Sequence, residues 1–382
     1  MPRQPSPSAS LIEMPSAAWK RSLARRLLAW FRRHRRDLPW RQSRDPYRIW
    51  ISEIMLQQTQ VATVVPYFNR FLEAFPTIEA LAAADEHEVL RLWEGLGYYR
   101  RARGMHEAAR QMVARFDGHF PTTLAEIGSL PGIGRYTAGA IASIAYDAQA
   151  PILEANTVRL LSRLVAFDGD PASGPGQKQL WALAEEILPR RGCGDFNQAL
   201  MELGSLVCTP KAPDCLACCL APLCAARAQG RQQEIPRRAT RVAIEAVREA
   251  SVVVWHGGKV FLRKRAAGER WAGLWDFPRF PLEAESAPAA RRELSQKVRE
   301  QTGLAIAGTR HFATLKHGVT RFRITLDCYA ATSRGAKSRL AGGQSQWIEP
   351  AGLERLALSV TGRKLSRMLD DPAARSPWRA SV

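Results

Sequence analysis

Four cysteines lie close together in the middle of the chain, with a spacing that could hold a metal centre. Cys208, Cys215, Cys218 and Cys224 follow the pattern C-x6-C-x2-C-x5-C. Four thiolates on one looping segment can close around a single soft metal centre. Zinc sites tend to show two symmetric CxxC knuckles, whereas this uneven run suits a cubane iron–sulfur cluster. The spacing predicts a metal centre, with a zinc ribbon as the alternative to a cluster.

A second motif is rich in glycine and has the composition of a phosphate-binding turn. The stretch "LPGIGRYTAG" runs from Leu130 to Gly139, between two segments with helical spacing. Gly132 and Gly134 let the backbone come close to a partner. The N–H groups of the turn and of the following helix N-terminus can then bind a phosphate. The pattern predicts a helix–hairpin–helix that grips a nucleic-acid backbone, and a simple turn between two helices is the alternative.

The elements that position these motifs are mostly helical over residues 19–235. Apolar residues recur at three and four positions in "WKRSLARRLLAWFRRH", "RIWISEIMLQQTQVATVVPYFNRFLEAF", "DEHEVLRLWEGLGYYRRARGMHEAARQMVARF" and "NQALMELGSLVC". Prolines are expected to mark helix boundaries, and they stand at Pro39, Pro66, Pro76 and Pro121.

The pattern changes after a polar linker, which we place at residues 228–245. The stretch "EASVVVWHGGKVFLRKR" is typical of a strand, a Gly-Gly turn and a second strand. "RFRITLDCYAAT" alternates as a half-buried strand does, and "SAPAARRELSQKVREQTG" predicts one helix between them. The sequence therefore predicts a multi-domain protein with an all-α core at 19–227 and an α+β domain at 246–370.

The charge of the chain points to a polyanionic partner. Lys and Arg number 55 against 36 Asp and Glu, which gives a net charge of +19 and a pI near 10.3. No stretch reaches the roughly 18 consecutive apolar residues of a membrane helix, so we expect no membrane partner. Residues 1–18 predict a disordered tail rather than a secretory signal, and 371–382 a second tail. Clustered cysteines favour a reducing compartment. We expect a bacterial cytoplasmic protein that is associated with the nucleoid.

With these motifs in place, the chain resembles the MutY family of adenine DNA glycosylases, within the endonuclease III superfamily. The resemblance runs from Leu38 to about Leu365 and rests on "LPWR", "DPYRIWISEIMLQQTQVATVVPYF", "LWEGLGYYRRAR", "LPGIGRYTAG", "FNQALMELGSLVCTP" and the four cysteines. It implies a [4Fe–4S] cluster on these cysteines. The C-terminal part, with "RWAGLWDFPRF", resembles that family's Nudix-like recognition domain. Around Glu293 and Glu300 the glutamates are too few for Nudix hydrolysis, which predicts a binding module.

The resemblance implies hydrolysis of the N-glycosidic bond of adenine by two carboxyl groups. The family's proton donor falls on Glu53, whose apolar neighbours should raise its pKa as an acid requires. The second carboxylate falls on Glu154, with Asn156 orienting it or a water. Relatives that also cut the strand carry a lysine where this chain has Tyr136, which predicts base removal without lyase chemistry.

Glu154 departs from the family, which has aspartate followed by Gly-Asn. The sequence here is Glu154-Ala155-Asn156. The additional methylene lengthens the reach by roughly 1–1.5 Å, and a misplacement of about 1 Å can cost on the order of a hundredfold in rate. We expect Glu154 to supply the negative charge from a rearranged loop, the alternative being an attenuated enzyme that binds lesions.

The resemblance also implies how the DNA is held. An adenine inside a duplex is out of reach, so it must be extruded. Gln58 and Tyr98 would fill or wedge the stack, although Tyr98 also fits a core position, and Gly132, Gly134 and Arg135 would hold the backbone. The residues implied to line the base pocket, besides Tyr136, are Leu38, Trp40, Arg41, Val61 and Gln198.

A lesion-reading turn in the C-terminal domain is implied at Leu315-Lys316-His317, where the family has Phe-Ser-His. A serine hydroxyl can accept the additional N–H of 8-oxoguanine, but the Lys316 ammonium cannot. We therefore expect weaker discrimination between 8-oxoguanine and guanine than is usual in the family. Lys316 could still contact the lesion's carbonyl or a nearby phosphate.

The function predicted from the sequence is that of a monomeric, monofunctional glycosylase that removes adenine opposite 8-oxoguanine or guanine in double-stranded DNA. One alternative is a lesion-binding protein that lost its rate through Glu154. The other is a glycosylase with changed base choice. A buried acid without chemistry is costly, so Glu53 argues against the first alternative. The complete set of adenine-pocket residues argues against the second. The sequence names no protein partner.

Overall fold

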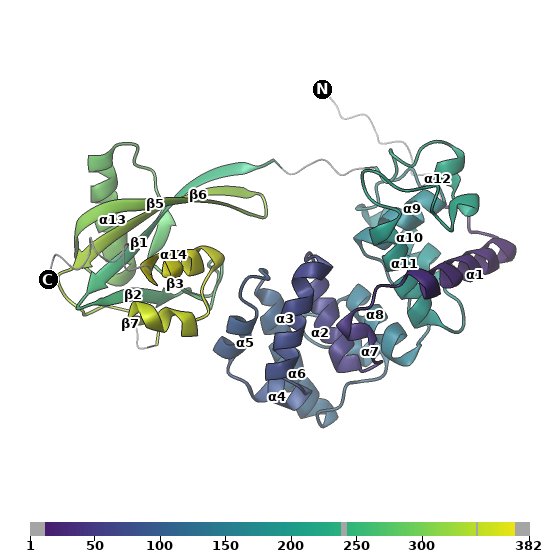
Figure 1. Ribbon diagram of the computed structural model, residues 1–382, viewed down its shortest axis with the longest axis horizontal. Coiled ribbons are helices and arrows are strands. Elements are labelled where there is room, and N and C mark those ends of the chain that lie inside the picture. The colour runs from purple at the N-terminus through teal and green to yellow at the C-terminus, as the bar shows by residue number, and fades with distance from the viewer. Residues whose placement is uncertain (1–11, 238–242, 341–342, 371–382) are drawn as a thin grey trace. The chain divides into compact units, whose positions relative to one another are not determined.

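The computed structural model describes residues 12–237, 243–340 and 343–370, and these residues form two compact units. One unit comprises residues up to Ala83 together with Gly104–Arg241, and the other comprises Ala84–Arg103 together with the chain from Val242 onwards. Figure 1 shows the helices of the first and the sheet of the second. Among the described residues, no helix has the length and apolarity to cross a bilayer.

The first unit is all-helical, as predicted, but residues 84–103 of the predicted domain at 19–227 belong to the other unit. Its helices are α1 (Ala17–His34), α2 (Pro46–Leu56), α3 (Val61–Ala74), α4 (Ile78–Ala83), most of α6 (Arg100–Phe116), α7 (Leu124–Gly128), α8 (Arg135–Tyr146), α9 (Ala155–Leu164), α10 (Gly174–Ile187), α11 (Cys193–Leu206) and α12 (Ala225–Ala228), with the short 3-10 turns η1 (Pro39–Arg41) and η2 (Ala221–Leu223).

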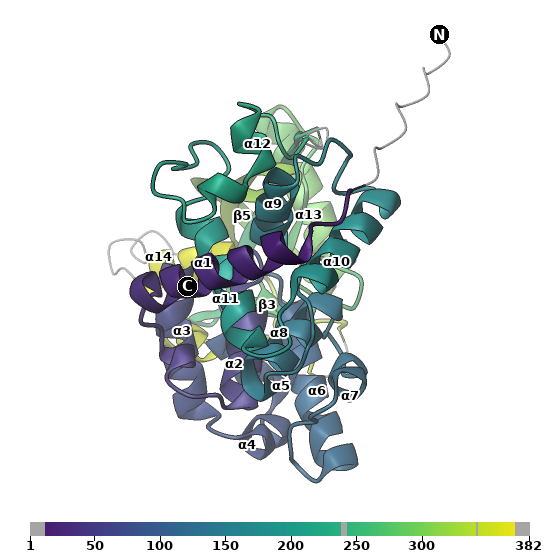
Figure 2. The same cartoon turned by 90° about the vertical axis from the view of Figure 1, so that its right-hand side faces the viewer.

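Helix α1 begins earlier than the predicted end of the N-terminal tail. Ser16 caps it by accepting a hydrogen bond from the Trp19 N–H at 3.3 Å. Ahead of the helix, the Ile12 N–H donates to Gln179 at 2.8 Å. The boundary at residue 18 is therefore wrong, and residues 1–11 lie outside the described residues. Helix α1 lies against α11 (Figure 2).

Two predicted helix boundaries differ from the structure. The stretch 48–75 forms two helices, because the chain leaves helical conformation at Gln57–Gln60, where Gln58 has φ 57°. Conversely, Pro66 was expected at a boundary but lies inside α3. It sits in the second turn of that helix, so its missing N–H removes one helical hydrogen bond.

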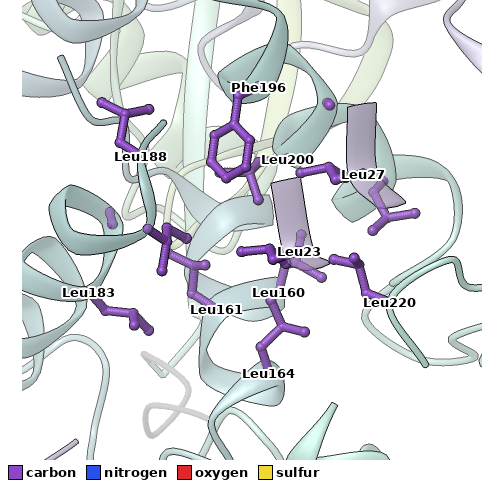
Figure 3. Close-up of a cluster of buried hydrophobic side chains, with 14 of the residues drawn as sticks. Leu23, Leu27, Leu160, Leu161, Leu164, Leu183, Leu188, Phe196, Leu200 and Leu220 are labelled. Atoms are coloured by element: carbon purple, nitrogen blue, oxygen red, sulfur yellow. The ribbon is translucent and has the colours of Figure 1, made fainter. Parts of the chain in front are cut away.

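The core of the helical unit is a cluster of leucines from α1, α9, α10 and α11 (Figure 3). Its members include Leu23, Leu27, Leu160, Leu183 and Leu200, all at most 2% exposed. Fully burying one such side chain contributes roughly 1.5–3 kcal/mol. This cluster fixes α9 and α11, which carry several of the candidate site residues.

The second unit contains helix α5 (Glu86–Leu92) and a seven-stranded sheet with the order β3-β2-β1-β6-β5. Strands β1 and β6 are parallel, whereas the other pairs are antiparallel; β4 pairs with β1 and β7 with β2. The elements are β1 (Glu245–His256), β2 (Lys259–Lys264), β3 (Trp275–Asp276), β4 (Arg279–Pro281), α13 (Ala287–Thr302), β5 (Ile306–Val319), β6 (Phe322–Ser333), β7 (Ser345–Ile348), η3 (Pro350–Arg355) and α14 (Val360–Asp370).

The predicted α+β pattern is confirmed for the four elements that the sequence indicated, which are β1, β2, α13 and β6. The Gly-Gly turn joins β1 to β2, and both Gly257 and Gly258 have positive φ (53° and 75°), as a two-residue hairpin loop requires. Helices α13 and α14 pack on opposite faces of the sheet, each over its own apolar cluster. The predicted linker at 228–245 overlaps the end of α12 and the start of β1. Ile235 within it is 1% exposed, and its carbonyl accepts from Arg163.

Candidate active site

The first candidate carboxyl group lies in the middle of an apolar helix. Helix α2 starts with Asp45 as its cap and Pro46 in its first turn, both favourable for a helix N-terminus. Every residue from Ile49 to Met55 is buried, and Glu53 is 6% exposed. The helix thus carries one carboxyl group into an apolar interior, as the sequence predicted.

The nearest partner of Glu53 is a neutral hydroxyl rather than a cation. Tyr136, in the first turn of α8, donates its hydroxyl to Glu53 Oε2 at 2.7 Å. Burial raises the pKa of Glu53 to about 7, and the charge of Glu154 adds to the rise. The Tyr136 hydrogen bond and the charge of Arg41 oppose it. A carboxyl group in this state keeps its proton near neutrality and can give it away.

The second carboxyl group caps a helix. Glu154 is the N-cap of α9 and accepts from the backbone N–H of Asn156 at 2.8 Å and of Thr157 at 2.9 Å. The Asn156 side-chain amide donates to the same carboxylate at 3.1 Å, and Arg159 in turn holds the Asn156 oxygen at 2.8 Å. The carboxylate is therefore fixed in orientation.

The electrostatic setting of Glu154 is mixed. Burial raises its pKa above the ordinary value, while the N–H donors of Asn156 and Thr157 and the charge of Arg159 pull it down. A helix N-terminus favours a negative charge as well. The net result is a raised pKa, although the loop still offers two backbone N–H donors to the Glu154 carboxylate. Thr157 completes the cap by accepting the Glu154 N–H at 2.7 Å.

Both carboxyl groups open on one cavity of about 190 Å³. Glu53 and Glu154 come from positions about a hundred residues apart and line the same space, together with Asn156 and Tyr136. The residues implied for the base pocket also line it, namely Leu38, Trp40, Arg41, Val61 and Gln198. The structure therefore brings all nine predicted catalytic and pocket residues together.

A third buried carboxylate in this cavity was missed from the sequence. Glu202 of α11 is 1% exposed and accepts from both Arg36 and Arg41. Burial alone would raise the pKa of Glu202, but these two guanidinium groups lower it to about 2. Glu202 holds Arg41 in the cavity wall. A lone acid in the apolar run "NQALMELGSLV" was a signal of the same kind as Glu53.

The glycine-rich motif forms a turn between two helices. Helix α7 ends at Gly128, and α8 begins at Arg135 with Gly134 as its cap. Gly132 has φ 76° and packs against Gly104. A Cβ added to Gly104 would lie 3.4 Å from the Gly132 Cα. Gly132 and Gly134 are exposed, which leaves the turn accessible. The Arg135 guanidinium stacks on Trp181 at 3.9 Å from the ring centre.

The two residues implied to fill the DNA stack share an unusual backbone. Gln58 in the helical unit and Tyr98 in the sheet unit have φ values of 57° and 48°. Non-glycine residues rarely adopt this left-handed conformation, and those that do are often functional. Gln58 is exposed and Tyr98 is 48% exposed, so a core position for Tyr98 is excluded.

The four cysteines surround one cavity. Cys208, Cys215, Cys218 and Cys224 all line it, whereas Cys219 does not. Arg163 donates to the Cys208 sulfur at 3.2 Å and to the Thr209 carbonyl at 2.8 Å. All seven cysteines are free. Within the described residues, no three His, Cys, Asp or Glu side chains are grouped closely enough to hold a single metal ion.

The predicted lesion-reading turn is wrong in its local structure. Leu315, Lys316 and His317 lie inside strand β5, paired with β6, and the hairpin turn follows them. Lys316 is exposed and His317 half-buried on the other face. Arg279 donates to His317 Nε2 at 3.2 Å, and burial together with Arg279 lowers the pKa of His317 to about 4. The ring is therefore neutral near pH 7, with its proton on Nδ1.

Glu293 and Glu300, on helix α13 of the Nudix-like domain, accept hydrogen bonds from neighbouring groups. Glu293 on α13 accepts from the backbone N–H groups of Glu283 and Ala284 at 3.1 and 2.8 Å. Glu300 accepts from the side chain of Gln296 at 2.8 Å.

Comparison with known proteins places both units. Residues 51–186 match the HhH-GPD superfamily of base excision DNA repair proteins, and residues 250–368 match the NUDIX domain. An adenine DNA glycosylase of Rattus norvegicus is 34% identical over 402 residues, which cover 91% of this chain and 78% of the relative. The Homo sapiens adenine DNA glycosylase is 33% identical over 90% of this chain and 73% of its own. This chain belongs to the adenine DNA glycosylase family. It is an enzyme of base excision repair that hydrolyses an N-glycosidic bond.

A bacterial relative and a solved structure complete the comparison. An adenine DNA glycosylase of Buchnera aphidicola subsp. Schizaphis graminum is 38% identical over 66% of this chain and 74% of its own. The structure of a thermostable thymine-DNA glycosylase matches 56% of this chain and 98% of its own, with a TM-score of 0.51 and 30% identity. The helical fold is thus shared with a glycosylase named for a different base.

Proposed function

We propose that the chain removes adenine mispaired with 8-oxoguanine or guanine in double-stranded DNA, with Glu53 as acid and Glu154 as the fixed negative charge. The observation that carries the proposal is the pair itself. The two carboxyl groups line one cavity, and their surroundings differ in the way their roles require. Sites that push two carboxyl groups into different protonation states separate the acid from the charge-stabilising partner.

In the proposed reaction, protonated Glu53 gives its proton to a ring nitrogen of adenine, which makes the base a better leaving group. The sugar then develops oxocarbenium character. The ionised Glu154, held by its cap hydrogen bonds, stabilises that positive charge without reorganising. A water adds to the sugar carbon, and its proton leaves to solvent or to Glu53.

The absence of lyase chemistry is proposed from Tyr136. A Schiff base needs an amine nucleophile, which Tyr136 lacks. The Tyr136 hydroxyl instead donates a hydrogen bond to Glu53. It supports the acid and closes that side of the cavity. The two carboxyl groups line a cavity inside the helical unit, so the adenine has to leave the duplex to reach them. Gln58 and Tyr98 are proposed to occupy the stack it vacates.

We propose a [4Fe–4S] cluster on Cys208, Cys215, Cys218 and Cys224. Four thiols around one cavity, with Cys219 turned away, fit a ligand set of four. When bound, the cluster would fix the loop between α11 and α12. Arg163 would donate to the Cys208 thiolate and thereby stabilise its charge.

Adenine, rather than a pyrimidine, is favoured by the curated relatives, which match both units and are named for adenine. The thymine-DNA glycosylase matches 56% of this chain only. A lesion-binding protein without catalysis is disfavoured because Glu53 and Glu154 are both held ready for proton transfer and charge stabilisation.

The test is single-turnover incubation with duplexes carrying adenine opposite 8-oxoguanine, guanine or thymine, read with and without alkali. We expect fast excision opposite 8-oxoguanine and guanine, little opposite thymine, and strand breaks only after alkali. Glu349→Gln, an exposed change outside the cavity, is the matched control and should behave as the unmodified enzyme. Strand breaks without alkali would contradict the monofunctional assignment, and no base release would contradict the catalytic one.

A further inference from the structure

An ion pair in the sheet unit joins two segments that match different families. Glu94 lies within residues 51–186 and Arg363 within residues 250–368. Arg363 Nε contacts Glu94 Oε1 at 2.6 Å and Nη2 contacts Oε2 at 2.9 Å, so the pair is bidentate. Both side chains are largely buried, with exposures of 14% and 17%. A bidentate, partly buried pair is stronger and more directional than an exposed one.

Backbone hydrogen bonds anchor this pair. The Leu358 N–H donates to Glu94 Oε2 at 3.1 Å. The Arg363 guanidinium also donates to the carbonyls of Leu353 and Leu356, at 2.9 and 2.6 Å. Arg363 is therefore held at the junction of η3 and α14 whether or not Glu94 moves. The carboxylate of Glu94 reaches into a preformed site with three N–H donors.

Glu94 begins the loop that presents Tyr98. Trp93 is fully buried and donates its indole N–H to the Gly97 carbonyl at 3.1 Å. Arg101 donates to the same carbonyl at 3.3 Å, and its guanidinium lies over the rings of Trp93 and Tyr98, at 5.3 and 5.6 Å. The loop is braced from within, so a displacement of Glu94 is passed on to Tyr98.

At its other end, the pair is linked to strand β5, which carries His317. Arg279 donates to His317 Nε2 at 3.2 Å and to Thr361 Oγ1 at 2.8 Å. Thr361 lies two residues before Arg363, in the first turn of α14. Contacts therefore run from His317 through Arg279 and α14 to Glu94. Energetic coupling between sites travels through such packed, hydrogen-bonded elements, and it has to be shown by measurement.

We propose that Glu94 and Arg363 are positioning residues that couple recognition of the base opposite adenine to insertion of Tyr98 into the duplex. When His317 meets 8-oxoguanine, the Arg279–α14–Arg363 connection holds Glu94, and with it the Tyr98 loop, in the inserting position. Opposite guanine, that hold is weaker. The pair thus contributes to the preference for the lesion while touching neither the reacting atoms nor the DNA. This inference rests on the proposed function.

The experiment is a double-mutant cycle on the preference for the lesion. Single-turnover rates of adenine excision are measured opposite 8-oxoguanine and opposite guanine for the unmodified chain, Glu94→Gln, Arg363→Gln and the double variant. We expect the excision rate of each single variant to fall about tenfold opposite 8-oxoguanine and less than twofold opposite guanine. The double variant should be no worse than either single one, because the pair acts as a unit. Arg363→Lys, which keeps the charge but loses the second hydrogen bond, should fall between.

Two further measurements keep the outcome interpretable. Arg248→Gln removes a different ion pair of the same unit, to Asp327, and should leave the preference unchanged. Fluorescence of 2-aminopurine placed beside the mispair reports unstacking by Tyr98, and it should rise less in Glu94→Gln than in the unmodified chain. Equal slowing opposite both bases, or additive effects in the double variant, would overturn the coupling. If the unmodified chain releases adenine without preferring 8-oxoguanine, the coupling is overturned as well, whereas release of no adenine from either duplex would mean that the proposed function fails.

Discussion

Two buried glutamates, one in each unit, show that hydrogen-bond partners, rather than the extent of burial, decide whether the pKa of a carboxyl group is raised or lowered. Glu53 in the helical unit and Glu249 in the sheet unit are 6% and 3% exposed. Burial raises the pKa of Glu53 to about 7, because its hydrogen-bond partner is a neutral tyrosine. Burial acts on Glu249 as well, but Arg279 and Arg270, each at 2.6 Å, overcome it and lower its pKa. The first is suited to give a proton and the second to hold a structure.

The same contrast occurs within the catalytic cavity. Glu202 lines it together with Glu53, yet two guanidinium groups lower the pKa of Glu202 to about 2. A cavity can therefore hold a permanently ionised carboxylate and a protonated carboxyl side by side.

The largest effect is expected from Glu53→Gln. The amide keeps the size of the side chain but has no acidic proton, so excision should slow by roughly 10²–10⁴-fold. Binding to the mispaired duplex should stay within a few-fold, because the surroundings are unchanged. Single-turnover rates and gel-shift affinities check this. A variant within tenfold of the unmodified rate would remove Glu53 from the mechanism, whereas Glu249→Gln should slow excision opposite guanine only through loss of stability.

Glu154→Asp should come next. Aspartate is an equally good helix cap, so the melting temperature should change little. The shorter side chain withdraws the carboxylate by about 1–1.5 Å from the position of the Glu154 carboxylate. We therefore expect the excision rate to fall by up to about a hundredfold. Glu154→Ala, which loses both cap and charge, should be slower still and about 0.5–2 kcal/mol less stable. An Asp variant faster than the unmodified chain would mean that the glutamate site is detuned.

The pH dependence follows from the pKa of Glu53. Glu53 is active when protonated, so the excision rate should be level just below pH 7 and fall about tenfold per unit above it. The rate should fall again at acid pH, where Glu154, whose pKa is raised by burial, takes up a proton. Stability has the same sign: the folded chain keeps this proton to about pH 7, and the unfolded chain loses it near 4.5. Stability should thus fall as pH rises between these values, by on the order of 3 kcal/mol.

Glu53→Gln gives the check on that pH dependence. The variant lacks the titrating group, so its stability should not fall between pH 4.5 and 7 and should exceed that of the unmodified chain at pH 8. Urea unfolding at several pH values measures both curves. Parallel curves would show that Glu53 is not the buried proton carrier.

Local signals in the sequence predicted most of the fold. Periodic apolar residues predicted α1, α11 and α13, and Gly257-Gly258 predicted the β1–β2 hairpin. These elements were predictable because each depends on residues that are close together in the sequence. Features made by distant contacts were missed. Arg36 and Glu202 are 166 positions apart, and Glu94 and Arg363 are 269 apart. No local pattern reports such a pair.

The candidate site shows the same division. Glu53 could be predicted because an acid in an apolar helix is unusual, and the four cysteines because their spacing is itself the signal. The cap at Glu154 has a local signature as well, since Thr157 follows three residues later. The conformation of Lys316 and His317 could not be predicted, because pairing with β6 decides it.

The smallest effect is expected at Lys316, whose side chain is exposed on β5. Lys316→Ser supplies a hydroxyl that can accept the additional N–H of 8-oxoguanine. A hydrogen bond of this kind contributes about 1 kcal/mol, so the preference for 8-oxoguanine over guanine should rise by about fivefold. Lys316→Ala lacks the acceptor and should weaken binding to both duplexes equally, by removing one phosphate contact. His317 titrates near pH 4, so these ratios should not change between pH 6 and 8. If Lys316→Ser and Lys316→Ala give the same ratio, the base opposite adenine is read by residues other than Lys316.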